Sequence, residues 1–225
     1  MVKLGLLFAL AVAATTLAAP PAASNSLASS LNGRAAKTCT NPSNLLKNPS
    51  FESKTISPWI YHAYYPKQTT QKIVKGGYKS DHALQVTGMA KLQNDMGYSQ
   101  MKQNFTTCKT GRYQLSWSMY LPKGAAQGID YRAPQMVVWV TCPGGAAQVA
   151  YFTFRPNLFE SNVSNPRKNS IQKVDQWVNT AVDLGTLQAG NCTLDVNWNV
   201  NGPAKGDPTS ILTLKLDNFV IKALS

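Results

Sequence analysis

The stretch Arg112-Tyr113-Gln114-Leu115-Ser116-Trp117-Ser118-Met119 alternates polar and apolar side chains without a break. A second stretch, Leu194-Asp195-Val196-Asn197-Trp198-Asn199-Val200, repeats the same period of two. Successive side chains of a β-strand point to opposite faces of a sheet, so the alternation predicts two strands that each have one buried face. The core of the protein is therefore expected to be built from β-sheet.

Other apolar segments are separated by turn signals rich in Gly, Pro and Asn, and none shows a helical period. They predict further strands over residues 83–87, 101–106, 135–141, 148–155, 177–184 and 211–221. The whole pattern predicts an all-β fold, an antiparallel β-sandwich of the jelly-roll kind with about eight to nine strands. Large apolar rings belong in such a core, where we expect Trp59, Trp117, Trp177 and Trp198.

The N-terminus has the order of a secretory signal peptide: Lys3, an apolar run from Leu4 to Ala14, then small residues. We predict a signal peptide over 1–19, a flexible leader or propeptide over 20–40 and one β-sandwich domain over 41–225. Cleavage after Ala18 fits the small-residue preference of this pattern, with Ala22 or Ala23 as the alternatives. The apolar run is too short to span a bilayer. The predicted protein is a secreted monomer, extracellular or in the cell wall, with no transmembrane segment.

The chain has four cysteines, Cys39, Cys108, Cys142 and Cys192. An even number in an exported chain, with no C-x-x-C pair, predicts two disulfides and not a metal site. Three pairings are possible. We favour Cys108 with Cys142, because each ends a predicted strand, which leaves Cys39 for Cys192.

Two further features concern modification and charge. Acceptor sequons for N-glycans begin at Asn104, Asn162 and Asn191. Lys and Arg number 22 against 10 Asp and Glu, a net charge of +12. The basic residues are scattered without a run of five or six, which favours a solvated basic face over a dedicated polyanion site. The charge tilts the expected partner toward anionic glycans, and no specific nucleic acid is expected.

Several segments, in this order, resemble the CenC-type carbohydrate-binding module. They are Asn44-Leu45-Leu46-Lys47-Asn48-Pro49-Ser50-Phe51-Glu52 with Trp59, Gly77-Tyr78-Lys79-Ser80-Asp81-His82-Ala83-Leu84, Gln103 before Cys108-Lys109-Thr110-Gly111-Arg112-Tyr113-Gln114-Leu115-Ser116-Trp117, Trp177, and Leu216-Asp217-Asn218-Phe219. The resemblance covers about residues 44 to 222 and implies a galactose-binding-like jelly roll that binds a polysaccharide or glycan. It also implies a structural Ca²⁺ held by Glu52 and Asp217, with carbonyls near Lys79 or Ser80. A carboxylate that caps a turn or pairs with a lysine is the alternative for each acid.

Sugar binding needs flat aromatic rings together with planar polar groups that reach hydroxyls. Three tyrosines follow the opening motif, a tyrosine and an arginine share one face of a predicted strand, and a polar ladder lies opposite the buried face of another. The predicted carbohydrate-binding residues are Tyr61, Tyr64, Tyr65, Tyr151, Arg155, Asp195, Asn197 and Asn199. The structural alternatives are tyrosines that seal a sheet edge and a ladder that is simply solvated.

Catalysis has little support in the sequence. Glycoside hydrolysis needs two facing carboxyls, and the best remaining choice is Glu160 with Asp175 or Asp183, without a supporting motif. Neither G-x-S-x-G nor H-E-x-x-H occurs. We therefore predict a secreted, non-catalytic carbohydrate-binding module, although members of the resembled family are often attached to glycoside hydrolases. The alternatives are a wall-associated structural or host-interaction protein and a glycan-cleaving hydrolase.

Overall fold

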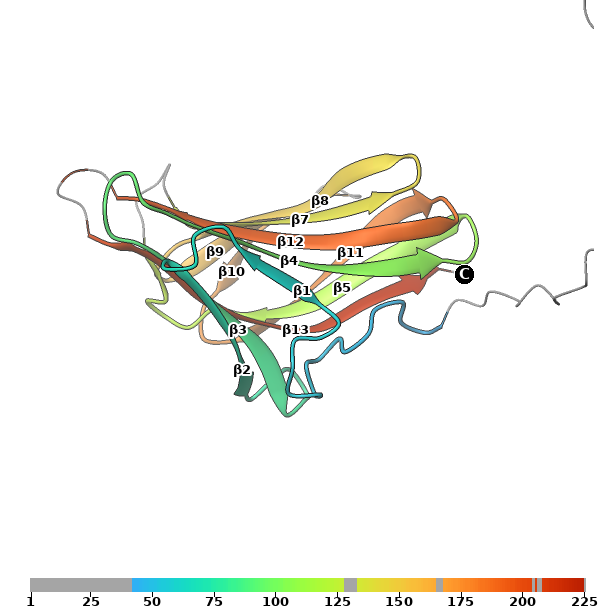
Figure 1. The fold of residues 1–225 in the computed structure, drawn as a ribbon, viewed down its shortest axis with the longest axis horizontal. Coiled ribbons are helices and arrows are strands. Elements are labelled where there is room, and N and C mark those ends of the chain that lie inside the picture. The colour runs from blue at the N-terminus through green and yellow to red at the C-terminus, as the bar shows by residue number, and fades with distance from the viewer. Residues whose placement is uncertain (1–41, 128–132, 165–167, 204, 206–207, 225) are drawn as a thin grey trace, which may run out of the picture. The chain divides into compact units, whose positions relative to one another are not determined.

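A computed structural model describes residues 42–127, 133–164, 168–203, 205 and 208–224. The predicted signal peptide, the predicted leader and Cys39 lie outside these ranges. The described part contains thirteen β-strands and no helix (Figure 1). Accordingly, no helix in these residues is long and apolar enough to cross a membrane.

The strands form two antiparallel sheets that face each other, which confirms the predicted β-sandwich (Figure 1). The seven-stranded sheet has the order β1 (Ile60–Ala63), β4 (Met96–Thr107), β12 (Gly190–Asn201), β7 (Gln135–Cys142), β8 (Gly145–Phe154), β9 (Leu158–Val163) and β10 (Lys168–Lys173). The six-stranded sheet has the order β11 (Trp177–Leu187), β5 (Gly111–Tyr120), β13 (Ser210–Ala223), β3 (His82–Ala90) and β2 (Thr69–Lys75), with β6 (Ala126–Gln127) paired to β13. Each sheet therefore has one face toward the core and one outer face.

The core lies between the sheets and is built from the apolar phase of each alternating strand. Trp117 of β5 packs against Phe152 of β8, with ring centroids 5.8 Å apart, so the ring contact joins the two sheets. Trp198 of β12 is equally buried. The expected burial is confirmed for Trp59, Trp117 and Trp198, but it is wrong for Trp177, which is only half-buried on the edge strand β11.

The opening segment is held against the last strand. The backbone N–H of Leu45 donates to the carbonyl of Ile221 (2.8 Å), and the Asn44 side chain donates to the carbonyl of Phe219 (2.9 Å). Phe219 also packs on the ring of Trp59, with centroids 5.1 Å apart. Residues near the two ends of the described chain thus close one core together, and this brings the loop that carries Glu52 close to β13.

More strands form than the eight or nine expected. The additional ones are β1, β2, β6, β9 and β10, which are short or rich in polar residues. Thr69–Lys75, for example, has no clean alternation, and it is held by seven register partners on β3. Pairing with a neighbour therefore organises strands that local sequence does not mark.

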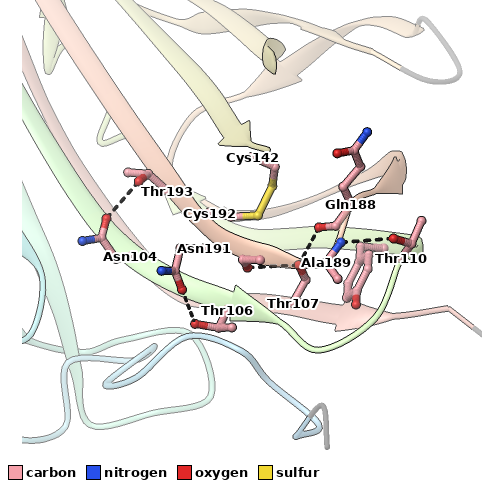
Figure 2. The surroundings of a disulfide bond; sticks show 12 residues. Asn104, Thr106, Thr107, Thr110, Cys142, Gln188, Ala189, Asn191, Cys192 and Thr193 are labelled. Carbon is pink, nitrogen blue, oxygen red and sulfur yellow. Dashed lines mark hydrogen bonds between the residues drawn. A yellow bond between two sulfur atoms is a disulfide. The ribbon is translucent and has the colours of Figure 1, made fainter. Parts of the chain in front are cut away.

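A disulfide joins Cys142, at the end of β7, to Cys192 in β12 (Figure 2). The favoured pairings, Cys108 with Cys142 and Cys39 with Cys192, are therefore wrong. The reason is the strand order: β12 lies between β4 and β7, so Cys192 is the neighbour of Cys142, whereas Cys108 lies beyond the end of β4. Cys108 is itself disulfide-bonded.

Candidate functional site

Polar and aromatic side chains gather on the outer face of the seven-stranded sheet, where β4 and β12 run side by side. The register places three pairs next to each other: Asn199 with Tyr98, Asn197 with Gln100, and Asp195 with Lys102. The residues between the ladder members on β12, Val196 and Trp198, point into the core and are buried. The three predicted ladder residues therefore share one surface. We call this surface the ladder face. It comprises Asp195, Asn197, Asn199, Tyr98 and Gln100, together with the neighbouring rings of Tyr64 and Trp139.

Hydrogen bonds order the ladder. Asn197 Nδ2 donates to Asp195 Oδ1 (2.8 Å), and Gln100 Nε2 donates to Asp195 Oδ2 (2.5 Å). The Tyr98 hydroxyl donates to Asn197 Oδ1 (2.8 Å). Asn199 Oδ1 is buried, and within the described ranges it accepts no hydrogen bond. The ladder is thus ordered by side-chain hydrogen bonds at the Asp195 end, and in the described residues it leaves one buried carbonyl oxygen unsatisfied at the Asn199 end.

Burial changes the acid–base behaviour of this surface. It raises the pKa of the Asp195 carboxyl and the pKa of the Tyr98 hydroxyl above their ordinary values. The Tyr98 hydroxyl is the donor in its hydrogen bond to Asn197 Oδ1. For Asp195, the hydrogen bonds from Gln100 and Asn197 work against the effect of burial.

Aromatic rings flank the ladder on both sides. Tyr64 stacks on Tyr98 with centroids 4.6 Å apart and an interplanar angle of 25°, and the His62 ring meets Tyr64 edge-on at 4.3 Å. Tyr64 remains 48% exposed. On the other side, Trp139 of β7 is 37% exposed and lines a hollow of about 140 Å³ with Tyr98, Val137, Asn197, Trp198 and Asn199. The side chain of Asn199 therefore lines the same hollow as an exposed indole.

A larger groove of about 770 Å³ crosses β8, β9 and β10 of the same sheet. It is lined by Tyr151, Thr153, Glu160, Ser161, Asn162, Ser170 and Ile171. Arg155, at the end of β8, donates through Nε to Glu160 Oε1 (3.4 Å). The groove thus contains the predicted Tyr151, and the predicted Arg155 is bound to one of its walls.

The other two predicted tyrosines lie elsewhere. Tyr61 turns toward the interior, where its ring stacks on Trp198 (centroids 6.0 Å apart) and its hydroxyl hydrogen-bonds to Ser99 (3.0 Å). Tyr65 is 42% exposed in the turn after β1, and no ring contact ties it to the ladder face within the described ranges. Of the three tyrosines, only Tyr64 takes part in the aromatic pair.

Tyr98, Gln100 and Trp139 belong to the ladder face, although none was predicted to bind sugar. A usable signal existed for Trp139. In the predicted strand over 135–141 it alternates with the apolar Met136, Val138 and Val140, so a tryptophan stands in the outward phase. An aromatic residue in the solvent phase of a strand is the kind of group that stacks on a ligand.

The predicted calcium ligands, Asp217 and Glu52, both accept hydrogen bonds from the segment that leads from β2 into β3. Asp217 is fully buried, and its Oδ2 accepts from Tyr78 N (2.5 Å) and Ser80 Oγ (2.6 Å). Glu52 accepts from the backbone N–H of His82 (2.8 Å) and pairs with its ring (3.2 Å). In the described part of the chain, no group of three or more His, Cys, Asp or Glu side chains is placed to hold a metal. Any cation here would also need backbone or hydroxyl oxygens.

The pKa values of Asp217 and Glu52 are shifted in opposite directions from their ordinary values. Burial raises the pKa of Asp217, and the negative charge of Glu52 adds to that effect. Desolvation acts to raise the pKa of Glu52 as well, but the hydrogen bonds from His82 hold it below its ordinary value. The two carboxylates therefore repel each other across the loop.

The acids considered for catalysis have separate partners. Glu160 binds Arg155 on the seven-stranded sheet, whereas Asp183 pairs with Arg112 on the six-stranded sheet. Asp175, in the turn before β11, accepts from the backbone N–H of Lys123 (2.8 Å). Each carboxylate thus has a local structural role.

Two of the three sequons interlock across β4 and β12 (Figure 2). The Thr193 hydroxyl donates to Asn104 Oδ1 (2.9 Å), and the Thr106 hydroxyl donates to Asn191 Oδ1 (3.0 Å). The third, Asn162, lines the large groove. All three asparagines therefore lie on the seven-stranded sheet, and their glycosylation stays a prediction.

Comparisons with known proteins give structural similarity alone. No family model and no curated protein matches the chain. Among solved structures, TmCBM61 in complex with β-1,4-galactotriose is 15% identical over 80% of this chain and 99% of its own, with a TM-score of 0.49. The enzymatically active domain of bacteriophage CBA120 tailspike protein 4 is 11% identical over 81% of this chain and 22% of its own, with a TM-score of 0.48. Cellulose induced protein Cip1 is 13% identical over 76% of this chain and 94% of its own, with a TM-score of 0.44. Matches this distant carry no argument about what this chain binds, and the CenC-type resemblance stays a prediction.

Proposed function

We propose that this protein binds a polysaccharide or glycan on the ladder face and does not cleave it. The observation that carries the proposal is the combination, on one surface, of an exposed indole at Trp139, the stacked pair of Tyr64 and Tyr98, and the hydrogen-bonded side chains of Gln100, Asn197 and Asp195. Rings of this kind pack on the C–H faces of a pyranose, and planar amides bind its hydroxyls.

The ladder suits an uncharged sugar better than a charged one. Its amide groups are already oriented by Asp195, Gln100 and Tyr98, so a ligand loses little free energy in ordering them. Asp195 lies beside Lys102 across the strands, and their opposite charges offset each other, so the face has no excess of positive charge for an anionic ligand. The proposed ligand of this face is therefore a neutral polysaccharide.

We propose further that the protein acts outside the cell. The Cys142–Cys192 bridge is typical of an oxidising compartment, since disulfides are rare in the cytosol. The predicted signal peptide over 1–19 agrees with export. Secretion would place the ladder face among extracellular or cell-wall polysaccharides.

A retention assay on a panel of insoluble and soluble neutral polysaccharides tests the function. We expect the wild type to be retained on at least one of them without release of reducing sugar. Trp139→Ala should lose most of that retention, because the indole supplies the main stacking surface. Leu92→Ala is the matched control, since Leu92 is 69% exposed in the loop between β3 and β4. Retention on no polysaccharide, or equal retention of Trp139→Ala, would refute the proposal.

A second proposal is a structural calcium ion near Glu52 and Asp217. Gly77 lies so close to the His82 carbonyl, the Ser80 hydroxyl and Asp217 Oδ2 that a Cβ there would collide with all three oxygens. Oxygens of this kind are the ligands calcium takes. When bound, the ion would supply the positive charge that offsets the repulsion between the two carboxylates.

Thermal melting with added calcium or excess chelator tests the calcium proposal. A ligand bound by the folded state alone stabilises it, so calcium should raise the melting temperature. The rise should shrink in Glu52→Gln and persist in Glu160→Gln, which removes the other glutamate of the chain. A melting temperature that changes with neither calcium nor chelator would contradict the calcium proposal.

We also propose that N-glycans, where present, limit access to the seven-stranded sheet. Asn162 pairs with Tyr151 across β8 and β9, so a glycan on it would occupy the large groove. Binding of a polysaccharide before and after enzymatic removal of N-glycans tests this. We expect tighter binding after removal, and the gain should be smaller in Asn162→Gln, in which Asn104 and Asn191 remain as N-glycan acceptors on β4 and β12.

A further inference from the structure

The outer face of the six-stranded sheet carries a row of side chains that lie in register across five strands. From β11 to β2 the row consists of Trp177, Tyr120, Lys215, Gln85 and Lys72. Neighbouring strands lie about 4.8 Å apart, so the row is about 19 Å long. Such a length accommodates several units of an extended polymer.

The row begins with a cluster of three aromatic rings. The Trp177 ring lies 5.6 Å from that of Tyr120 and 6.1 Å from that of Tyr78, which comes from the loop after β2. Asn179 Nδ2 donates to the Tyr78 hydroxyl (2.7 Å) and holds this ring over the sheet. All three rings are only half-buried, so part of each is open to a ligand.

Ammonium groups accompany the rings. Lys79 Nζ lies 5.3 Å from the centre of the Tyr78 ring, and Lys215 Nζ lies 5.5 Å from that of Tyr120. Lys72, at the other end of the row, is exposed. No ion pair with a carboxylate is found for any of these three lysines in the described residues. The positive charge of the row is therefore available to a ligand.

The acids near this face form no ion pair with the lysines of the row in the described residues, although Asp175 is exposed two residues before Trp177 and Asp81 three residues after Tyr78. Asp183 is paired with Arg112, and Asp217 is fully buried under the loop that carries Tyr78. The chain as a whole has a net charge of +12, which attracts polyanions from a distance. Local and overall charge thus favour the same kind of partner.

We propose that this row, which we call the lysine row, is a second binding surface, for a polysaccharide that carries uronic acid carboxylates. The rings at one end would pack on the C–H face of a sugar, and Lys215 and Lys72 would bind carboxylates further along the chain. A nucleic acid suits the row less well, because affinity for nucleic acids comes from many phosphate contacts, whereas the row offers two lysines and the adjoining loop one more, Lys79. The lysine row lies on the other sheet and does not depend on the function proposed for the ladder face.

Binding of soluble polygalacturonate, alginate and polyglucuronate at low and high salt tests the inference, with fully methyl-esterified polygalacturonate as the uncharged control. We expect at least one acidic polymer to bind, and esterification to abolish its binding. Raising the salt from about 0.05 M to about 0.5 M should weaken that binding strongly, because exposed charges are screened. Each of Lys215→Gln and Lys72→Gln should reduce affinity about two- to fivefold.

Matched variants separate this surface from the ladder face. Lys173→Gln removes the same charge from β10 of the seven-stranded sheet and should leave binding of the acidic polymer nearly unchanged. Trp139→Ala should also leave it unchanged, so that failure of one surface is distinguishable from failure of the other. The inference is overturned if no acidic polymer binds, if the methyl ester binds equally well, or if Lys173→Gln has the same effect as Lys215→Gln. Tighter binding of a single-stranded oligonucleotide than of every acidic polymer would assign the row to nucleic acid instead.

Discussion

The outer faces of the two sheets differ in how their polar side chains are paired. On the ladder face, Asp195, Asn197, Gln100 and Tyr98 satisfy one another through hydrogen bonds. On the lysine row, ammonium groups stand over aromatic rings without a carboxylate partner in the described ranges. A sheet whose inner face is committed to the core leaves its outer face free to vary, which allows two binding chemistries on one scaffold.

The largest predicted effect concerns the disulfide, which lies in the seven-stranded sheet alone. Its cysteines are 50 residues apart, so replacing both by alanine should cost about 4 kcal/mol of the free energy of unfolding in the chain-entropy model. Chemical denaturation of the Cys142→Ala and Cys192→Ala double variant measures this. A loss under about 1 kcal/mol would show that strand pairing alone holds β7 against β12.

The next largest effect is expected from removing one exposed tryptophan from each face. Trp139→Ala should weaken neutral polysaccharide binding about tenfold and spare acidic polymers, and Trp177→Ala should do the reverse. Titration calorimetry of both variants against both ligands checks the pattern. If either variant loses both ligands while its melting temperature is unchanged, the two faces are not separate sites.

A smaller effect is expected within the tyrosines of the first strand and its following turn. Tyr64→Ala should reduce neutral polysaccharide affinity about threefold to tenfold, because its ring continues the stack of Tyr98. Tyr65→Ala is the control, since Tyr65 is exposed to a similar degree and lies outside that stack. Equal losses in the two variants would extend the ladder face into the turn.

The smallest effect is a pH dependence of the ladder. Burial raises the pKa of Asp195 in the folded state, so the folded protein takes up this proton before the unfolded chain does. The stability that results is fully present below the unfolded pKa of about 3.9 and is lost as the pH rises through the folded pKa. The melting temperature of the wild type relative to Asp195→Asn should therefore increase when the pH is lowered from neutral to about 4. A constant difference would show that Asp195 is not desolvated.

The main strands could be predicted because their signal is local. In β5 and β12 the alternation of side chains itself specifies which face is buried, and every apolar member of the alternation is buried in the structure. Two members of the polar phase, Ser118 and Asn197, are buried as well. The short polar strands β9 and β10 carry no such signal, and their backbone groups are ordered by the strands beside them. Nonlocal pairing of this kind is invisible to a pattern of period two.

The candidate site divides in the same way. Asp195, Asn197 and Asn199 were predictable as one ladder because all three lie on a single strand. The inward turn of Tyr61 depends on the pairing of β1 with β4, which places it opposite the buried Met101. The correct partner of Cys142 likewise depends on the position of β12 between β4 and β7, a consequence of strand order that no local motif expresses.

The central claim, that the ladder face binds a glycan, is tested most directly by the indole N–H signals of the five tryptophans in a nitrogen-15 NMR titration. On addition of a retained neutral polysaccharide fragment, the Trp139 signal should shift or broaden, while those of the buried Trp59 and Trp117 and of Trp177 on the other sheet should stay in place. A titration in which Trp139 is unmoved at saturation, or in which Trp177 shifts instead, would contradict the claim.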